Sequence, residues 1–220
     1  MIKPTLSIFR KELAIELRTR YAFNTLLAFT GSALLLILFT LRADQMSPTP
    51  KSGLVWIIIL FAAMTGMMRT FLQEADKKTW DLLKLHAKPS SVFAGKLLYN
   101  FLFLLILHLF TFFFYLFMMN MNVVSIPYFM AALFFGSAGL ATVTTLTSAM
   151  IAKADQRGSI FSVLCIPLLV PLLLILTSVT KTALIEGSSA DALNDLSALI
   201  GYCGVTITAG ILLFDFIWED

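Results

Sequence analysis

The sequence predicts an all-α membrane protein that crosses the bilayer six times. Of its 220 residues, 59% are apolar and only 13% are charged, and the mean hydropathy is +0.88. A soluble domain has about 25% charged residues, so too few polar side chains remain here to cover a water-facing surface. A helix needs roughly 20 residues to cross about 30 Å of hydrocarbon. The six candidate spans are residues 22–41, 53–68, 97–119, 126–152, 160–179 and 196–217.

The distribution of basic residues predicts that both termini face the cytoplasm. Thirteen of the 16 Lys and Arg residues lie in residues 1–21, 69–96 and 153–157, which six spans would place on one side. Only Arg42, Lys51 and Lys181 lie on the other side. Because cytoplasmic loops are enriched in Lys and Arg, we expect one multi-pass domain over residues 1–220 with both ends inside the cell.

An amphipathic helix is predicted for residues 2–20, ahead of the first span. Apolar residues recur there at spacings of three and four and so share one face. They are Ile2, Leu6, Phe9, Leu13 and Leu17. Basic residues such as Arg10 lie largely elsewhere, and such a helix lies in the membrane interface. It is either a general anchor or an elbow helix that holds a membrane domain against a cytoplasmic partner.

Residues 69–96 form the longest inner loop, in which six basic and three acidic residues alternate with apolar ones. A short helix over residues 77–86 would place Trp80 and Leu83 one turn apart on one side. The following Lys-Pro-Ser-Ser sequence would end it, and Ser90 or Ser91 would cap the third span. The helix either rests on the bilayer or docks into another protein. An aromatic anchor among charges favours docking.

The fourth span, residues 126–152, combines small and hydroxyl side chains. The pairs Ala132-x-x-x-Gly136 and Ser137-x-x-x-Ala141 permit close approach of neighbouring helices. Ser and Thr hydroxyls can bond back to helical carbonyls, so the six of them do not argue against a span.

Three further features of the apolar segments leave alternatives open. His108 lies within the third span, where an ionisable side chain needs a partner; it is either an axial haem ligand or a hydrogen bonder between helices. Pro167 and Pro171 stand one turn apart in the fifth span and each removes a helical hydrogen bond, which indicates either a static kink or a hinge. Residues 180–195 fit both a re-entrant hairpin and a plain loop.

The motifs of an autonomous enzyme are missing from the sequence. Gly95-Lys96 is followed by Leu97, so no phosphate-binding loop is present, and the common zinc-protease, paired-cysteine and serine-hydrolase motifs are also absent. A net charge of +3 is too small to suggest nucleic-acid binding. We therefore expect a non-catalytic subunit with no catalytic residue, no metal site and no cofactor of its own.

Several short motifs occur along the whole chain, and their order and spacing can be compared with those of known families. They are Phe9-Arg10-Lys11-Glu12-Leu13, Gly53-Leu54-Val55-Trp56, Arg69-Thr70-Phe71 with Glu74, and Arg157-Gly158 leading into Ile166-Pro167-Leu168-Leu169-Val170-Pro171. In this order they resemble the permease of a type II ABC exporter, and most closely the membrane (permease) subunit of the cytochrome c maturation haem exporter. One difference is Lys78-Thr79-Trp80, where that family tends to place a glycine.

The resemblance implies a subunit of the bacterial inner membrane that works with partners. These would be an ABC ATPase, a second copy of this chain, a haem-handling membrane subunit, a small single-span subunit and a periplasmic haem chaperone. Partner subunits would bind ATP and haem, and ATP hydrolysis would drive release of the haem-loaded chaperone or haem export. The implied ATPase-coupling residues are Glu74, Asp76, Trp80, Asp81 and Leu83.

Other functions remain open at this point. A type II permease could carry a drug, a lipid or a glycan instead of haem. A membrane-embedded enzyme acting on lipid would need clustered acidic residues at the inner face, which the sequence lacks. A purely structural assembly subunit would tolerate changes in residues 69–96.

Overall fold

The computed structural model describes residues 2–40, 47–152, 157–188 and 191–219, which are almost entirely helical and form no strand. Six helices in this part of the chain are long and apolar enough to span a membrane. They are α2 (Tyr21–Thr40), α3 (Pro48–Met67), α6 (Pro89–Met119), α7 (Ile126–Met150), α8 (Arg157–Lys181) and α9 (Ala192–Glu219). The predicted all-α, six-span fold is confirmed.

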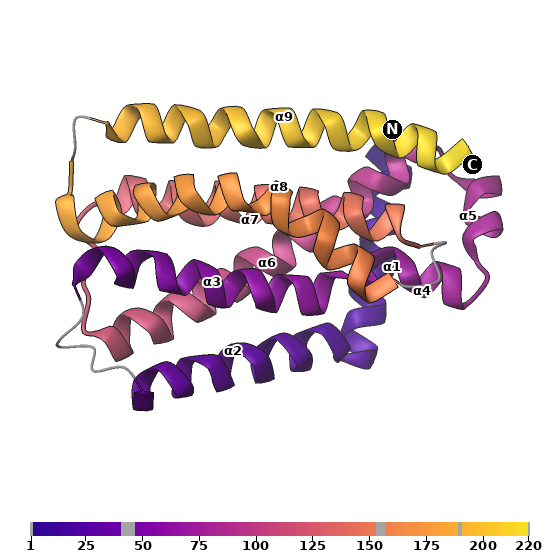
Figure 1. Cartoon of the computed structure of the whole chain (residues 1–220). Coiled ribbons are helices and arrows are strands. Elements are labelled where there is room, and N and C mark those ends of the chain that lie inside the picture. Colours follow the sequence, from indigo (N-terminus) through magenta and orange to yellow (C-terminus); the bar gives the residue numbers. More distant parts are fainter. Residues whose placement is uncertain (1, 41–46, 153–156, 189–190, 220) are drawn as a thin grey trace.

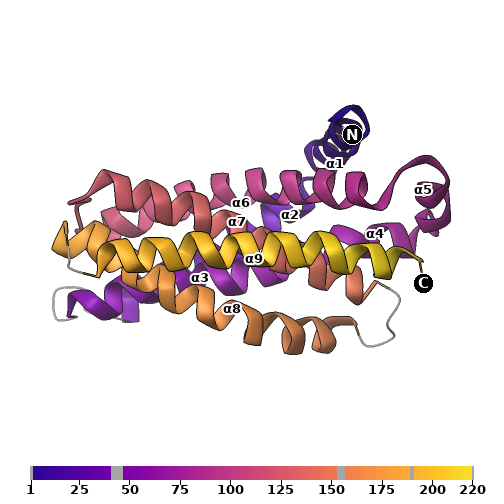
Figure 2. The ribbon, with the colours of Figure 1, turned by 90° about the horizontal axis from the view of Figure 1, so that it is seen from above.

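Three shorter helices lie together at one end of the bundle: α1 (Ile2–Thr19), α4 (Arg69–Asp76) and α5 (Trp80–His86) (Figure 1). The C-terminal end of α9 lies at the same end, as an even number of spans requires. Figure 2 shows that α1 crosses the bundle axis at a steep angle instead of running along the spans. Helices α1 and α5 correspond to the short helices predicted over residues 2–20 and 77–86, although α5 begins at Trp80, whereas α4 was not predicted. All three share the end of the molecule that carries both termini.

Helix α7 lies at the centre of the bundle and packs against α3, α6, α8 and α9. The close approach depends on Gly136, because a Cβ atom added there would lie 2.6 Å from the Trp56 ring of α3. Thr144 Oγ1 and Thr147 Oγ1 each bond to the carbonyl four residues earlier. The sequence-based interpretation of this span, with small residues for packing and hydroxyls bonding back to the helix, is confirmed.

The boundaries of the spans differ from the prediction by a few residues, and most for the third span. The third span begins at Pro89, eight residues earlier than expected, because Pro is well tolerated at the first helical position. Ser90 and Ser91 lie inside its first turn and Lys88 is the N-cap, so the predicted serine cap is wrong. The second span is followed almost at once by α4, with a short break in the helix between them. Ser148 of α7 bridges this break, because its hydroxyl donates to the Met68 carbonyl and accepts from the Phe71 amide.

Helix α8 contains both prolines, and its N-terminal part runs obliquely away from α7 and α9 (Figures 1 and 2). Pro167 and Pro171 point outward and are exposed. The hydroxyl of Tyr202 in α9 donates to the Leu168 carbonyl between the two prolines. The prolines therefore lie in a bent helix that α9 contacts at the bend, and their role as a hinge stays a prediction.

The described residues between α8 and α9 form no re-entrant hairpin. The helix continues beyond Lys181 as a π-helical turn, η1 (Thr182–Glu186), which ends at Gly187 with φ +72°. Lys181 Nζ lies 2.6 Å from Glu186 Oε1, so an ion pair bridges this turn. Of the two possibilities left open by the sequence, the described part favours a short extension of α8 followed by a loop.

Candidate coupling site

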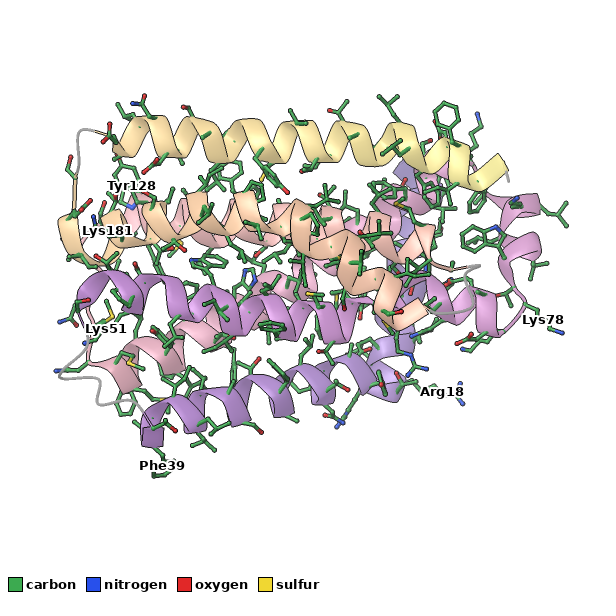
Figure 3. The ribbon with its side chains drawn as sticks, in the orientation of Figure 1. Arg18, Phe39, Lys51, Lys78, Tyr128 and Lys181 are labelled. Atoms are coloured by element: carbon green, nitrogen blue, oxygen red, sulfur yellow. The ribbon has the colours of Figure 1, made fainter. Side chains whose placement is uncertain are left out.

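A tight turn joins α4 to α5 at the end of the bundle that carries both termini. Helix α4 ends at Asp76, and the amide of Thr79 returns to the carbonyl of Glu74 at 2.9 Å. Lys78 reverses the chain with φ +54°, in the left-handed region. The two helices therefore form a compact hairpin, and Figure 3 shows Lys78 at its outer tip.

An aromatic cluster seats α5 against the rest of the bundle. The Trp80 ring lies 5.7 Å from Phe71 of α4 and 5.6 Å from Trp218 of α9, measured between ring centroids. Phe214 of α9 stacks between Phe71 and Phe93 of α6, at 5.2 Å from each. Tilted aromatic pairs at these separations contribute about 0.5–1.5 kcal/mol each beyond area burial. The hairpin is thus anchored to α6 and α9.

A cluster of four charged side chains joins α1, α4 and α6, and we call it the charge clamp. Its members are Lys11 and Glu12 of α1, Glu74 of α4 and Lys96 of α6. Lys96 Nζ donates to Glu12 Oε1 at 2.7 Å, to Glu74 Oε1 at 2.9 Å and to the Thr70 carbonyl at 2.7 Å. An ammonium group has three donors, so Lys96 is fully satisfied although its side chain is wholly buried.

Lys11 completes the charge clamp at its outer side. Lys11 Nζ lies 2.7 Å from Glu74 Oε1 and 3.1 Å from Glu12 Oε1. Burial acts to lower the pKa of Lys11, but the carboxylates of Glu12 and Glu74 outweigh it and the pKa is raised. Two ammonium groups thus balance two carboxylates. Buried ion pairs of this kind add little net stability but fix geometry when every donor is satisfied.

The close crossing of α1 over α6 places the clamp residues together. A Cβ atom on Gly95 would lie 2.8 Å from both Ile8 Cβ and the Thr5 carbonyl, so the crossing depends on this glycine. Lys96 follows Gly95 directly, and Glu12 lies one turn after Ile8 on the same face of α1. The backbone approach at Gly95 therefore brings the two charged side chains within hydrogen-bonding distance.

Polar contacts continue from the clamp into the centre of the bundle. Asn100 Nδ2, one turn after Lys96 in α6, donates to Thr70 Oγ1 at 3.0 Å and to Thr145 Oγ1 of α7 at 2.7 Å. Lys96 Nζ also lies 4.8 Å from the centre of the Phe71 ring. The clamp thus connects α1 and α4 to α6, and through Asn100 to α7.

A groove of about 500 Å³ separates α1 from the α4–α5 hairpin. Its lining residues are Lys11, Ile15, Gln73, Glu74, Lys77, Thr79, Leu82 and Leu83. Leu82 is 58% exposed and Leu85, on the same helix, is 81% exposed. Exposed leucines next to a partly charged groove give this end of the molecule a surface with the chemistry of a protein interface.

Residues 3–214 match the model of the CcmB protein family. The chain belongs to the CcmB family. This family is that of the membrane subunit of the haem exporter, an ABC transporter that serves cytochrome c biogenesis, so the resemblance inferred from the motifs is confirmed. No curated protein matches the chain. The CcmB assignment makes it a permease subunit and a multi-pass membrane protein.

The turn at Lys78 has a backbone conformation that favours glycine. A left-handed conformation is readily adopted by glycine and costs other residues about 1–2 kcal/mol. Lys78 nevertheless adopts φ +54°. The hairpin turn therefore forms in this chain with a lysine at its left-handed position.

Two of the five predicted ATPase-coupling residues are buried within the CcmB-family chain itself. Glu74 is 5% exposed and Trp80 is 8% exposed, so their side chains offer a partner little surface. Asp76 is exposed and Leu83 is half-buried beside the groove. Asp81 lies in α5, but its side chain is outside the described part. The positions of Glu74 and Trp80 favour an indirect role, in which they hold the hairpin in place.

The predicted apolar stripe of α1 is only partly covered by the bundle. Leu17 is exposed, and Phe9 and Leu13 are half-buried, whereas Ile8 and Glu12 form the buried face. Arg10, on the basic face, is exposed. The exposed part of this stripe, on a helix that crosses the spans, is consistent with an interfacial elbow.

His108 is fully buried between α3 and α7. Its Nδ1 lies 2.7 Å from Ser137 Oγ, and its ring meets the Trp56 ring edge-on at 5.5 Å. Trp56 in turn donates from Nε1 to Thr180 Oγ1 of α8. The bond to Ser137 fits the hydrogen bonder between helices, while the buried Nε2 has no hydrogen-bond partner, so haem ligation stays a prediction. Among the described residues, no group of three His, Cys, Asp or Glu side chains is placed to hold a metal ion.

The charge clamp is the feature that sequence reasoning missed. A third span that starts at residue 97 leaves Lys96 in the preceding loop. The helix begins at Pro89, which places Lys96 inside it. A lysine next to a long apolar helix needs an oppositely charged partner. A search for that partner among the acidic residues could have predicted Glu12 and Glu74.

Proposed function

We propose that this chain couples ATP hydrolysis by a partner ABC ATPase to haem trafficking during c-type cytochrome biogenesis. In this proposal the ATPase closes on ATP, pushes the α4–α5 hairpin, and the movement leads to release of the haem-loaded periplasmic chaperone or to haem export. ATP and haem are held by partner subunits. A second copy of this chain, a haem-handling subunit and a small single-span subunit complete the assembly.

The charge distribution supports a cytoplasmic location for the end that carries α1, α4 and α5. The described basic residues of the N-terminal segment and of residues 69–96 gather at this end, whereas Lys51 and Lys181 lie at the opposite end (Figure 3). The positive-inside rule relates such an asymmetry to orientation. We therefore propose an inner-membrane protein whose hairpin and both termini face the cytoplasm, within reach of an ATPase.

Two exposed leucines of α5 provide the contact surface in this proposal. Leu82 and Leu85 project from a helix whose opposite side is anchored by Trp80. A rigidly held helix with exposed apolar side chains is suited to seat in a groove of a partner. The groove lined by Lys11 and Lys77 lies beside it and would accept acidic side chains of the ATPase.

The charge clamp is the observation that carries the proposal. Glu74 belongs to the hairpin element α4, and its carboxylate bonds to Lys96 of α6 and Lys11 of α1. A push on α5 is thereby passed to a span and to the helix that crosses it, because packed elements joined by buried ion pairs move as one body. The hairpin is thus mechanically joined to the transmembrane bundle.

Substitution of the exposed leucines tests this assignment. We expect Leu85→Glu, alone or with Leu82→Glu, to lower both ATPase association and cytochrome c maturation at least tenfold, because a carboxylate would replace an apolar contact. Val124→Glu is the matched control, since Val124 is exposed in a loop at the opposite end. Normal ATPase association and maturation in the Leu82→Glu/Leu85→Glu variant would contradict the proposal.

A further inference from the structure

An apolar cleft of about 420 Å³ lies between α2 and α6 and is closed at one end by α1. This volume is within the range of about 300–1,000 Å³ typical of small-molecule sites. The lining residues are Leu13, Glu16, Leu17, Arg20, Phe23, Leu26, Leu27, Phe103, Ile106, Leu107 and Phe110. The cleft is separate from the groove at the hairpin and shares no residue with the charge clamp.

The walls of the cleft are apolar, and its closed end is charged. Leu26 and Leu107 form a buried floor, and Phe23 and Ile106 form an exposed rim. Along α6 the lining runs from Phe103 to Phe110, about 10 Å at 1.5 Å per residue. That length fits within one leaflet, which is about half of a 30 Å hydrocarbon core.

The two charged groups lie where α1 turns into α2. Arg20 has φ +51° and joins the two helices. Glu16 Oε1 accepts the amide of Phe23 at 2.8 Å, which holds the carboxylate at the start of α2. The Tyr99 hydroxyl also donates to the Glu16 carboxylate. A carboxylate has about four acceptor positions, so Glu16 retains the capacity to bind a further donor. The closed end is therefore lined by one guanidinium and one carboxylate.

We propose that this cleft binds a phosphatidylethanolamine molecule from the leaflet that contains α1. One acyl chain lies between α2 and α6, the phosphate pairs with the Arg20 guanidinium, and the ammonium group donates to Glu16. An arginine guanidinium matches phosphate geometry well, and a lipid with a primary ammonium group matches both charges. Since Leu13 and Leu17 of α1 lie across the end of the cleft, a membrane-spanning helix of a partner could not continue along it, whereas a lipid ends there in its headgroup.

The bound lipid would complete the contact between the first span and the bundle. Only Ala22, Leu26, Thr30 and Leu34 of α2 are buried. An acyl chain in the cleft adds apolar contacts on the side of α2 that faces α6. The lipid therefore acts as a structural ligand that fixes the first span relative to α1.

The test measures lipid retained by the complete, membrane-extracted complex after repeated detergent washing, by mass spectrometry. We expect phosphatidylethanolamine to be retained over phosphatidylglycerol and phosphatidylcholine, and to fall at least tenfold in Arg20→Ala and in Leu27→Trp, which fills the cleft. Arg18→Ala and Leu36→Trp are matched controls, because Arg18 lies two residues before Arg20, Leu36 lies on the same helix as Leu27, and both are exposed and outside the lining. Arg18 lies at the outer edge of the molecule (Figure 3).

A second measurement uses the unaltered protein, so that misfolding of a variant cannot decide the outcome. Phosphatidylethanolamine with a photoreactive group near the end of one acyl chain should crosslink to residues 23–27 or 103–110. Equal retention of the three lipids, unchanged retention in Arg20→Ala and Leu27→Trp, or crosslinks only elsewhere would overturn the proposal. The readout requires no ATPase activity, so it is independent of the proposed coupling function.

Discussion

Lys96 Nζ lies 2.7 Å from Glu12 Oε1, although the two residues are 84 positions apart in the sequence. Both side chains are buried, and the contact ties α1, which crosses the spans, to the start of α6. Together with Glu74 it makes α1, the α4–α5 hairpin and a span parts of one charge-balanced unit. The position of the hairpin is therefore fixed by electrostatics as well as by aromatic packing.

Removal of Lys96 should destabilise the protein strongly. In Lys96→Met the carboxylates of Glu12 and Glu74 lose their buried partner and retain only Lys11, and breaking a buried ion pair costs about 3–5 kcal/mol. We expect the free energy of unfolding, measured by denaturant titration in detergent, to fall by about 3 kcal/mol.

A compensated variant separates stability from coupling. Lys96→Met with Glu12→Leu leaves the neutral pair of Lys11 and Glu74, so most of the lost unfolding free energy should return. ATP-driven cytochrome maturation should stay low, because α1 is no longer bonded to α6. Full maturation in the stable double variant would show that the bond between Lys96 and Glu12 has no part in coupling.

Trp80→Ala should loosen the hairpin without removing a direct ATPase contact. The side chain packs against Phe71 and Trp218, and loss of a buried Trp side chain costs about 3–5 kcal/mol of local packing. We expect faster hydrogen exchange in residues 80–86 and ATP hydrolysis that continues without cytochrome maturation. Trp80→Phe, which keeps an aromatic ring, should behave like the unaltered protein; if Trp80→Ala matures cytochromes equally well, the anchoring role is wrong.

Lys78→Gly should stabilise the hairpin turn. The left-handed backbone at this position costs a lysine about 1–2 kcal/mol more than a glycine, offset in part by the greater freedom of glycine in the unfolded chain. We expect a small increase in thermal stability of the purified complex with unchanged cytochrome maturation. Lys77→Gly is the comparison, since Lys77 has φ −86° and gains nothing there; it should be neutral or destabilising.

His108→Gln should leave cytochrome maturation within about twofold of normal. Glutamine can still hydrogen-bond to Ser137 at a cost of no more than about 1 kcal/mol, but it cannot replace histidine as an axial haem ligand. The measurements are maturation in cells and the haem absorption spectrum of the purified complex. A tenfold loss of maturation together with a changed spectrum would assign a ligand role to His108.

Much of the fold could be predicted from the sequence because the membrane restricts what the chain can do. Every span must be an apolar helix about 20 residues long. The positions of the lysines and arginines predict that both termini lie on the same side of the membrane as residues 69–96. Gly136 permits the close approach of a neighbouring helix, and the hydroxyl residues of α7 bond back to helical carbonyls, as expected from the sequence. These features are local in sequence, so local patterns were sufficient.

The details of the candidate site could not be predicted because they depend on long-range geometry. The placement of Lys96 required knowledge that α6 begins at Pro89, and its pairing with Glu12 required the crossing of α1 at Gly95. The residue type of Trp80 predicts a docking anchor, but Phe71 and Trp218 of the same chain cover it. The exposed leucines of α5, Leu82 and Leu85, had no pattern that marked them as more important than Trp80.

Site-specific crosslinking at position 85 tests the central claim most directly. A photoreactive amino acid at this position, in the intact complex in native membranes, should crosslink to the partner ATPase, and the crosslink should depend on the bound nucleotide. The same group at position 124, at the opposite end of the molecule, should give no ATPase crosslink. An ATPase crosslink from position 124 and none from position 85 would contradict the proposed orientation and the coupling role of the hairpin.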